Sequence, residues 1–520
     1  MMATETELKL SLACDALQRV ARLPIVRQHA RGRGIRRHLT NVYYDTSDQR
    51  LVAAGVALRV RRVEKRFLQT VKTAGTVYAG MHSRGEWEWE LPNHKLDLRL
   101  CDAEPEIAAV FVDPALRTTL QPLFTTDFWR TTWLLVFADS SLIELAVDRG
   151  KVSGLGRTTP ICELELELKA GSPQRLYEVA HALAEALPIR LENTSKAARG
   201  YALLAPPKPL IAQKAGVCSL DQNASAEEAF QTIVQYCLDH LHTNAAVVCQ
   251  GEDTEGVHQM RVATRRLRSC LGLFRPLIPR TASDLVNTEV RWLSSELAFA
   301  RDWDVFLEET LSPLERHFPD ILSSLRLATL EARANAYQRA RAAVESARYT
   351  RLLLGIGLWR TRCDWRDLLT PKLLRDLHRP AIGFAARVLA KRYARVRQGC
   401  DGFLQLSAEE RHRLRILCKR LRYAGEFFAA LYPESTVRDF LRSVAKVQDI
   451  LGVLNDAVVA SRLLTELGTD PKYPAIPMPA RHLVLGWKAA MIEQNLAFFE
   501  SAWAAFCNQP CFWQSSYENS

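Results

Sequence analysis

Three segments of the chain carry charged side chains at every second position. These side chains are Glu5, Glu7 and Lys9 in the first segment, Arg84, Glu86, Glu88 and Glu90 in the second, and Glu163, Glu165, Glu167 and Lys169 in the third. Successive side chains of a strand point to opposite faces, so each set lies on one face. One such strand is typical of a solvated sheet face. Several of them, with mainly leucine and tryptophan between the charges, favour a barrel that has a charged interior.

Further pairs of polar or charged residues share one face of a predicted strand. They are Arg59 and Arg61, Thr70 and Lys72, and Glu144 and Asp148, the last pair with Ala146 between its members. Paired carboxylates suit a hard divalent cation such as Mg²⁺, and arginine and lysine suit phosphate oxygens. Neither charge set could be buried without the other. The combined pattern predicts a site for a metal ion and a polyphosphate.

The chain has 520 residues, 48% of them hydrophobic, which is enough for two or three domains with cores of their own. Its net charge of +11 favours anionic partners. Strands are expected near 4–12, 38–45, 56–65, 67–74, 82–91, 126–138, 141–149 and 159–170, with helices near 14–22, 173–187 and 195–204. After a linker at 206–220 that begins with a proline-rich stretch, almost everything has the pattern of amphipathic helix. We therefore expect an α+β chain with a barrel domain at 1–205 and a helical domain at 221–510.

The twelve cysteines include no pair with CxxC spacing. Neither a zinc site nor a disulfide framework is indicated, and reduced thiols in the cytoplasm are expected. The N-terminus does not have the pattern of a secretory signal, and no apolar run is long enough to span a membrane. A cytoplasmic location without membrane attachment is predicted.

The helical region contains an internal repeat, with halves at about 221–350 and 375–510. The segment from His258 to Arg268 aligns without a gap on the segment from His412 to Arg422. The repeat predicts two similar helical bundles, each with a basic stripe. The stripe residues are His258, Arg261, Arg265 and Arg268, and His412, Arg415, Lys419 and Arg422. A single basic stripe is usually solvated surface, whereas two stripes facing one groove would bind a linear polyanion.

The N-terminal region resembles the CYTH superfamily, the triphosphate tunnel metalloenzymes. The matching segments are Glu5-Thr-Glu7-Leu-Lys9, Asn41 to Thr46, Leu58 to Arg61, Thr70-Val-Lys72, Asp127 to Arg130, Glu163 to Glu167 and Ser195 to Tyr201. The resemblance implies an eight-stranded antiparallel barrel, open at both ends, that hydrolyses or cyclises triphosphates with Mg²⁺ or Mn²⁺.

The resemblance also implies roles for single residues. Glu5, Glu7, Glu163 and Glu165 would bind the metal, with Asp148 and Glu167 as secondary candidates. Lys9, Arg59, Arg61, Lys72, Arg130, Lys196 and Arg199 would hold the triphosphate, the last two from a C-terminal helix. Arg84 would either join them or pair with Glu86. Lys196 and Glu165 are the candidate catalytic residues.

The helical region resembles the CHAD domain, a module associated with inorganic polyphosphate. The matching segments are Val257 to Arg268, Arg301 to Asp304, Leu414 to Tyr423 and Gln448 to Asp456. The two resemblances predict an inorganic triphosphatase with a polyphosphate-binding module, associated with polyphosphate granules if the polymer recruits it. The alternatives are a hydrolase of thiamine triphosphate or a nucleoside triphosphate, and a polyphosphate-binding scaffold with an inactive barrel.

Nucleic acid is not expected as a partner, because the basic stripes lack interleaved aromatic residues. The segment Arg31-Gly-Arg33-Gly-Ile-Arg36-Arg37 is interpreted as a solvated turn. Most of the tryptophans Trp87, Trp89, Trp129 and Trp133 are expected to serve in the packing of the core or of the outer barrel wall.

Overall fold

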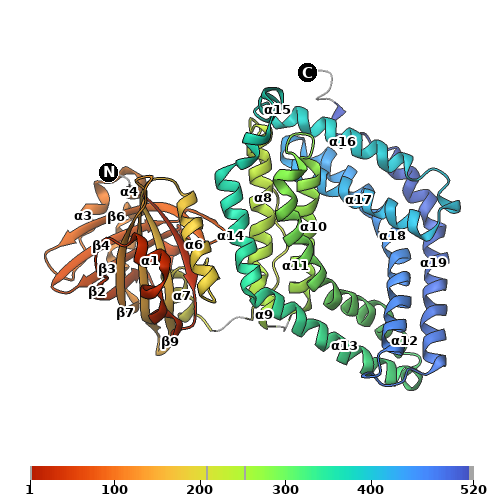
Figure 1. Cartoon of the computed structure of the whole chain (residues 1–520), viewed down its shortest axis with the longest axis horizontal. Helices are drawn as coiled ribbons and strands as arrows, with labels where there is room; N and C mark the ends of the chain where they lie inside the picture. Colours follow the sequence, from red (N-terminus) through yellow and green to blue (C-terminus); the bar gives the residue numbers. More distant parts are fainter. Residues whose placement is uncertain (1–2, 207–208, 251–252, 515–520) are drawn as a thin grey trace. The chain divides into compact units, whose positions relative to one another are not determined.

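The computed structural model describes residues 3–206, 209–250 and 253–514 of the chain. It divides into two compact units, and each is described here by itself (Figure 1). The first unit comprises Met1–Pro209 and Ala347–Arg362, and the second comprises Leu210–Ser346 and Cys363–Ser520.

The first unit is built around one antiparallel barrel. Its strands are β1 (Ala3–Ser11), β2 (Ile35–Asp45), β3 (Val56–Val63), β4 (Arg66–Thr73), β5 (Thr76–Tyr78), β6 (Met81–Leu91), β7 (Gln121–Val136), β8 (Leu142–Gly154), β9 (Arg157–Ala170) and β10 (Arg190–Leu191). The strand order β1-β9-β8-β7-β2-β3-β4-β6 closes on itself through the pairing of β1 with β6. Short β5 and β10 add to β6 and β1. The predicted eight-stranded barrel is confirmed.

The strand register places opposite charges side by side on the inner face. Lys9 pairs with Glu165, Arg130 with Asp148, Lys72 with Glu86, and Glu5 with Arg84, whereas Asp148 lies opposite the like-charged Glu163. Such cross-strand neighbours attract one another, whereas like charges in the same places would repel. The alternation seen in single strands is therefore completed by charge matching between strands.

Helices cover part of the outer wall. They are η1 (Ala16–Arg22), α1 (Pro24–His29), α2 (Arg50–Ala53), α3 (Arg99–Asp102), α4 (Pro105–Ala108), η2 (Ala109–Phe111), α5 (Pro114–Thr119), α6 (Gln174–Ala186) and α14 (Ala347–Arg362). Helix α14 follows the first half of the helical repeat in sequence, yet it packs on α6. Its Thr350 hydroxyl donates to the Ile189 carbonyl at 2.9 Å, and its Gly357 lies directly against the Tyr177 ring. The sequence patterns gave no sign of this placement.

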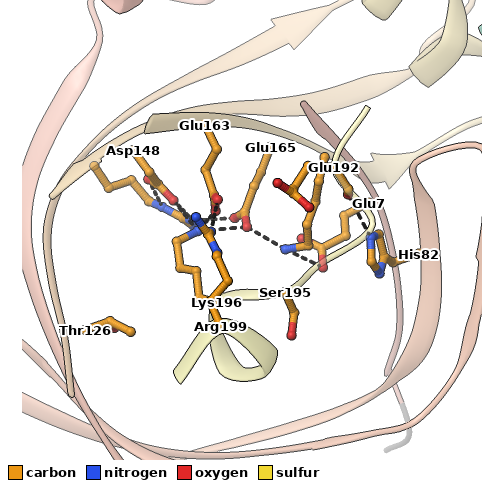
Figure 2. Close-up of polar contacts among 12 residues, drawn as sticks. Glu7, His82, Thr126, Asp148, Glu163, Glu165, Glu192, Ser195, Lys196 and Arg199 are labelled. Atoms are coloured by element: carbon orange, nitrogen blue, oxygen red, sulfur yellow. Dashed lines mark hydrogen bonds and ion pairs between the residues drawn. The ribbon is translucent and has the colours of Figure 1, made fainter. Parts of the chain in front are cut away.

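Helix α7 (Lys196–Leu203) lies inside the ring of strands, as Figure 2 shows. Ser195 caps its N-terminus by accepting from the Ala198 amide. The Tyr201 hydroxyl donates to Asp45 at 2.9 Å, and Gly200 lies in close contact with the Phe124 ring. These contacts fix the helix that carries Lys196.

A Gly200→Ala substitution is expected to displace α7, because the new Cβ would overlap the Phe124 ring. We expect a loss of about 1–3 kcal/mol of unfolding free energy from overpacking. Activity of the barrel should fall by about tenfold through misplacement of Lys196. Thermal melting and phosphate release measure the two effects. Ala202→Gly on the exposed face of the same helix costs about 1 kcal/mol by propensity alone, so it should spare activity.

Cys14 and Cys162 form a disulfide. This contradicts the expectation that the cysteines are all reduced thiols. The two residues are far apart in sequence, but the pairing of β1 with β9 places Ser11 opposite Glu163 and so brings their Cα atoms to 5.1 Å. The other ten cysteines take no part in this disulfide.

The second unit is helical, as predicted. Its helices are α8 (Ala226–Thr243), α9 (Ala245–Gln250), α10 (Thr254–Leu273), α11 (Arg280–Phe306), η3 (Leu307–Leu311), α12 (Ser312–Glu315), α13 (Pro319–Glu345), η4 (Asp364–Leu368), α15 (Pro371–Leu377), α16 (Ala381–Gln398), η5 (Phe403–Gln405), α17 (Ala408–Phe428), η6 (Ala429–Leu431), α18 (Glu434–Thr469) and α19 (Met478–Cys507). No helix in the described part of the chain is long and apolar enough to cross a membrane.

The internal repeat appears as matched helices. Asp253 caps α10 and Ser407 caps α17, and Pro279 precedes α11 as Pro433 precedes α18, all at the offset that aligns His258 with His412. Helices α8, α10, α11 and α13 pack in series, as do α16, α17, α18 and α19, and each helix of one series contacts its match in the other. Contacts between equivalent elements indicate a pseudo-twofold arrangement.

Candidate functional site

The barrel encloses a cavity of about 970 Å³ that gathers most of the predicted site residues. Among its lining residues are Glu5, Glu7, Lys9, Arg59, Arg61, Lys72, Arg84, Arg130, Glu165, Glu167 and Lys196. Acidic and basic side chains alternate around it, so the cavity can hold an anion and a cation together.

Three carboxylates form a compact acidic group. Oxygen atoms of Asp148, Glu163 and Glu165 lie within 4.8 Å of one another, and all three residues are buried. The Lys196 ammonium lies among them, 2.7 Å from Asp148 and 2.9 Å from Glu165, with an ion pair to Glu163 as well (Figure 2). A position where three hard oxygen donors surround one cation fits a divalent metal ion.

Glu5 and Glu7 lie in a second acidic pair, outside this group. Glu5 accepts from Lys72 at 2.7 Å and from Arg84 at 3.0 Å. Glu7 accepts from Arg84 at 2.5 Å. The Lys9 ammonium links the two sets, 3.1 Å from Glu7 and 2.6 Å from Glu165. The structure therefore moves Asp148 into the acidic group, although the sequence ranked it below Glu5 and Glu7.

The cations keep these carboxylates ionised. Burial opposes ionisation, but Lys196, Lys9 and Arg130 hold the pKa of Glu165 well below its ordinary value. In the same way Lys72 and Arg84 outweigh burial and lower the pKa of Glu5. Glu165 and Glu5 are thus charged at neutral pH and ready to bind a cation.

Arg59 and Arg61 form the part of the cavity whose positive charge is least neutralised. Arg59 has Glu86 at 3.7 Å, and its guanidinium donates to the Tyr43 hydroxyl at 3.4 Å. Arg61 donates to the Asn41 side chain at 2.8 Å, and among the described residues no carboxylate lies within 4 Å of it. Burial and the charges of Arg59 and Arg130 lower the pKa of Arg61 to about 10. An anion placed here would relieve this repulsion.

The other predicted residues have defined partners. Arg130 forks onto Asp148 at 2.6 and 2.8 Å and also contacts Glu165. Arg199 contacts Glu163. Glu167 lies 2.5 Å from Lys169, away from the acidic group, and burial raises its pKa. Arg84 pairs with Glu5 and Glu7 rather than with Glu86.

The sequence did not single out Tyr43, Asn41 or Phe128 as site residues. Tyr43 and Asn41 share the inner face of β2 and bond to Arg59 and Arg61. The Phe128 ring lies 5.1 Å from the Lys196 ammonium. The available signal was the strand period of two. Asn41 and Tyr43 are two positions apart on β2, and Phe128 is two positions before Arg130 on β7, so each lies on the face of its strand that carries a site residue.

The pseudo-twofold pairing of α10 with α17 brings parts of the two basic stripes together in the helical unit. Besides burial, the charges of Arg265, Arg301 and Arg415 lower the pKa of Arg261, and the charge of Arg265 lowers that of Arg415. The charges of Arg265, Arg415 and Arg261 act in the same way on Lys419. Burial and the charges of Arg265 and Arg415 lower the pKa of Lys419 to about 6. We call these five residues the helical cation cluster.

The acidic residues of the repeat lie beside this cluster. Asp302 is 3.8 Å from Arg261 and 2.6 Å from Arg462. Asp456 acts on Arg415 and Lys419 and opposes the lowering of their pKa. Two aspartates cannot neutralise the four arginines of the cluster, so it retains excess positive charge even where Lys419 is neutral.

The remaining stripe residues divide. Burial, Arg301 and the cluster arginines lower the pKa of His258 to about 4, which places it beside the cluster. His412 instead shares a hydrogen bond with Asn455 at 2.8 Å. Arg268 lies near Arg291 and Arg420, and Arg422 donates to Glu426 at 2.8 Å. The structure thus gathers only part of the predicted stripe in one place.

Comparison with known proteins agrees with this architecture. The CYTH domain family matches residues 3–201, and the CHAD domain family matches residues 232–465. A crystal structure of the CHAD domain from the plant Ricinus communis is 33% identical, covers 58% of this chain and 98% of its own, and has a TM-score of 0.50.

A curated protein named inorganic triphosphatase, from Haemophilus influenzae, is 34% identical over 208 residues. The match covers 39% of this chain and 56% of that relative, so the chain spans little more than half of the relative's length. The barrel and the helical unit described above are accordingly a CYTH domain followed by a CHAD domain.

Proposed function

We propose that the barrel hydrolyses inorganic triphosphate to pyrophosphate and phosphate. The observation that carries the proposal is the cavity, which is lined by Glu165 of the buried three-carboxylate group and by Arg61, whose pKa neighbouring cations and burial lower. The identity of the curated relative, an inorganic triphosphatase, supports the same reaction.

The cavity residues divide into three proposed tasks. Arg59, Arg61, Lys72 and Lys9 hold the phosphates, and Asp148, Glu163 and Glu165 bind Mg²⁺ or Mn²⁺, with Glu5 and Glu7 close by. Lys196 and Arg130, which contact the acidic group, stabilise the charge that moves onto the pyrophosphate leaving group. Water attacks the terminal phosphorus, and the bond to the bridging oxygen breaks.

A bound divalent ion would polarise the phosphoryl oxygens and lower the pKa of a coordinated water. Glu165 is suited to orient the attacking water, because its lowered pKa makes it a poor place to keep a proton. The Lys196 ammonium would lie at the centre of the acidic group when no metal ion is bound. It would contact the substrate phosphate when a metal ion takes that place.

An inorganic substrate is favoured over thiamine triphosphate or a nucleotide by the aromatic residues of the cavity. The Tyr43 ring stacks on Phe124, and the Phe128 ring lies near Lys196 and Arg130. The other aromatic residues that line the cavity, Trp87, Trp89 and Tyr201, pack in the hydrophobic clusters of the barrel wall. A base or a thiazole would need an aromatic surface of its own, and these rings are already engaged.

The test is phosphate release from tripolyphosphate, ATP and thiamine triphosphate, each with Mg²⁺ or Mn²⁺ and the full-length protein. We expect the highest kcat/KM with tripolyphosphate. A preference for ATP or thiamine triphosphate would contradict the inorganic substrate. No release from any of the three, with polyphosphate binding intact, would favour a scaffold with an inactive barrel.

We propose that the helical unit binds inorganic polyphosphate. The helical cation cluster, made from both halves of the repeat, supports this, because a linear polyanion would relieve the repulsion among its members. Binding of long-chain polyphosphate should weaken steeply with salt. Undiminished binding after Arg261, Arg265, Arg415 and Lys419 are all changed to glutamine would remove the proposal. Neutralising exposed Arg438 and Arg442 is the matched control.

Polyphosphate binding is expected to take up a proton at Lys419. With a pKa of about 6, Lys419 is mostly neutral at pH 7 and above, and the bound polyanion would restore its charge. Above pH 7, affinity should therefore fall by up to about tenfold per pH unit, because one proton is taken up on binding. Lys419→Arg stays charged and should flatten this dependence. Equal slopes for the two proteins would refute the role of Lys419.

A further inference from the structure

The outer face of strands β2, β7 and β8 carries an exposed basic surface with an aromatic residue at its centre. The register aligns His38 with Trp129 and Trp129 with Arg149 in one row across the three strands. The next row holds Thr40, Asp127 and Lys151, and Arg62 of β3 pairs with Thr40. The row on the other side holds Arg36, Thr131 and Val147. We call these rows the outer basic face.

Trp129 is 46% exposed, which contradicts the expectation that it serves in packing. Its neighbour Phe128 points inward and is 1% exposed, as strand alternation requires. The Arg36 guanidinium lies 4.4 Å from the centre of the Trp129 ring, and the His38 ring lies 4.9 Å away. A large aromatic surface in water, held between a cation and an imidazole, has no structural need that explains its exposure.

The charge of this face is one-sided. Among the described residues, no carboxylate lies within 4 Å of Arg36, Arg149 or Lys151, and Asp127 is already paired with His38 at 2.8 Å. Arg31 and Arg33, in the turn before β2, are exposed as well. The surface therefore attracts polyanions.

We propose that the outer basic face binds single-stranded nucleic acid: the exposed Arg36 side chain turns from the Trp129 ring to a backbone phosphate, an unpaired base stacks on the ring in its place, and Arg149 and Lys151 bind further phosphates. A flat ring flanked by arginines on an open sheet is the arrangement that stacks bases without reading their sequence. Inorganic polyphosphate would use the cations but not the ring. A membrane surface would want several protruding apolar side chains, whereas the neighbours of Trp129 include Thr40, Thr131 and Asp127.

The sequence does not indicate nucleic acid as a partner, because the basic stripes of the helical unit have no interleaved aromatic residue and the segment from Arg31 to Arg37 has the pattern of a solvated turn. The structure corrects the second point, since Arg36 and Arg37 lie on β2. On the barrel the aromatic residue and the cations come from different strands, so only the register reveals the pattern.

The experiment uses full-length protein and fluorescein-labelled 20-nucleotide single-stranded RNA and DNA with hydroxyl ends, the duplex of the same sequence, and anionic phospholipid vesicles. We expect Trp129→Ala to weaken binding of the single strands by about tenfold, and Trp129→Phe by much less, because stacking on a ring is lost only in the first. Duplex binding should change little. Arg36→Gln/Arg149→Gln should reduce both affinity and its dependence on salt.

Tripolyphosphate hydrolysis and thermal melting should be the same for Trp129→Ala and wild type, since the ring lies outside the barrel. Equal affinity of the two proteins for single strands would overturn the proposal. The proposal would also be overturned if Trp129→Ala weakened duplex binding as much as single-strand binding, because base stacking would then not contribute to the affinity. Loss of vesicle binding alone would replace the nucleic acid by a membrane surface.

Discussion

Glu165→Gln is expected to lower tripolyphosphate hydrolysis by about 10³-fold, the loss associated with removing a central electrostatic group of a phosphoryl-transfer site. Glu165 belongs to the three-carboxylate group and contacts Lys9, Lys196 and Arg130. The amide removes one negative charge from the metal site and leaves these cations in excess. Both the affinity for the metal ion and the placement of Lys196 should suffer.

Phosphate release and Mn²⁺ titration by calorimetry measure the two consequences. Glu90→Gln is the matched control, since Glu90 shares the inner-face alternation of β6 but is exposed and lies 3.9 Å from Arg66. It should keep activity within about threefold of wild type, as expected for an exposed pair. Activity within tenfold of wild type for Glu165→Gln, with unchanged Mn²⁺ affinity, would exclude the acidic group as the metal site.

A second comparison separates the two acidic sets. Glu5 and Glu7 are engaged by Lys72 and Arg84, whereas Glu165 faces Lys196. If the metal lies only in the three-carboxylate group, Glu5→Gln/Glu7→Gln should alter KM more than Mn²⁺ affinity, because it frees Lys72 and Arg84 to bind the substrate differently.

The barrel was predictable from sequence because its signal is local. Glu163, Glu165 and Glu167 alternate with leucines within one strand, and a period of two needs no knowledge of neighbouring strands. The same alternation at Glu5 and Glu7, and at Arg59 and Arg61, was enough to put all of these residues on inner faces.

The arrangement within the barrel was not predictable, because it depends on register. Asp148 joins Glu163 only because β8 and β9 pair in one alignment, and a shift of one residue would have turned it outward. The same applies to Cys14 and Cys162, which β1 and β9 bring together, and to the row that contains Trp129. A single strand carries none of this information.

In the helical unit too, the repeat was visible in the sequence but the packing of its helices was not. The repeat of His258 at His412 was plain in the sequence, and matched helices do contact one another. The way in which α10 packs on α17 decides which cations lie close together. Arg261 and Lys419 therefore belong to one cluster, whereas Arg422 donates to Glu426. The placement of α14 against α6 is a long-range packing choice that periodicity does not encode.

Arg61→Gln is expected to raise the KM for tripolyphosphate by about 100-fold, since a buried charge-assisted contact to phosphate would be lost. The same substitution is expected to stabilise the unliganded barrel. In the folded protein burial, Arg59 and Arg130 lower the pKa of Arg61 to about 10, so the charged form is less favourable there than in the unfolded chain. Below pH 10 folding therefore carries a cost that the neutral amide removes.

We expect this gain to be about 1–2 kcal/mol, reduced from the full pKa difference by the partial solvent access of the side chain. Thermal melting without ligand should show a higher Tm for Arg61→Gln, and saturating tripolyphosphate should raise its Tm less than that of wild type. Arg61→Lys keeps the charge and should retain part of the affinity. Arg62→Gln changes the outward-facing neighbour and should move neither quantity. If Arg61 serves to bind the ligand, it lowers the stability of the barrel without tripolyphosphate and raises it with tripolyphosphate. A lower Tm for Arg61→Gln both without and with tripolyphosphate would show instead that Arg61 has a structural role.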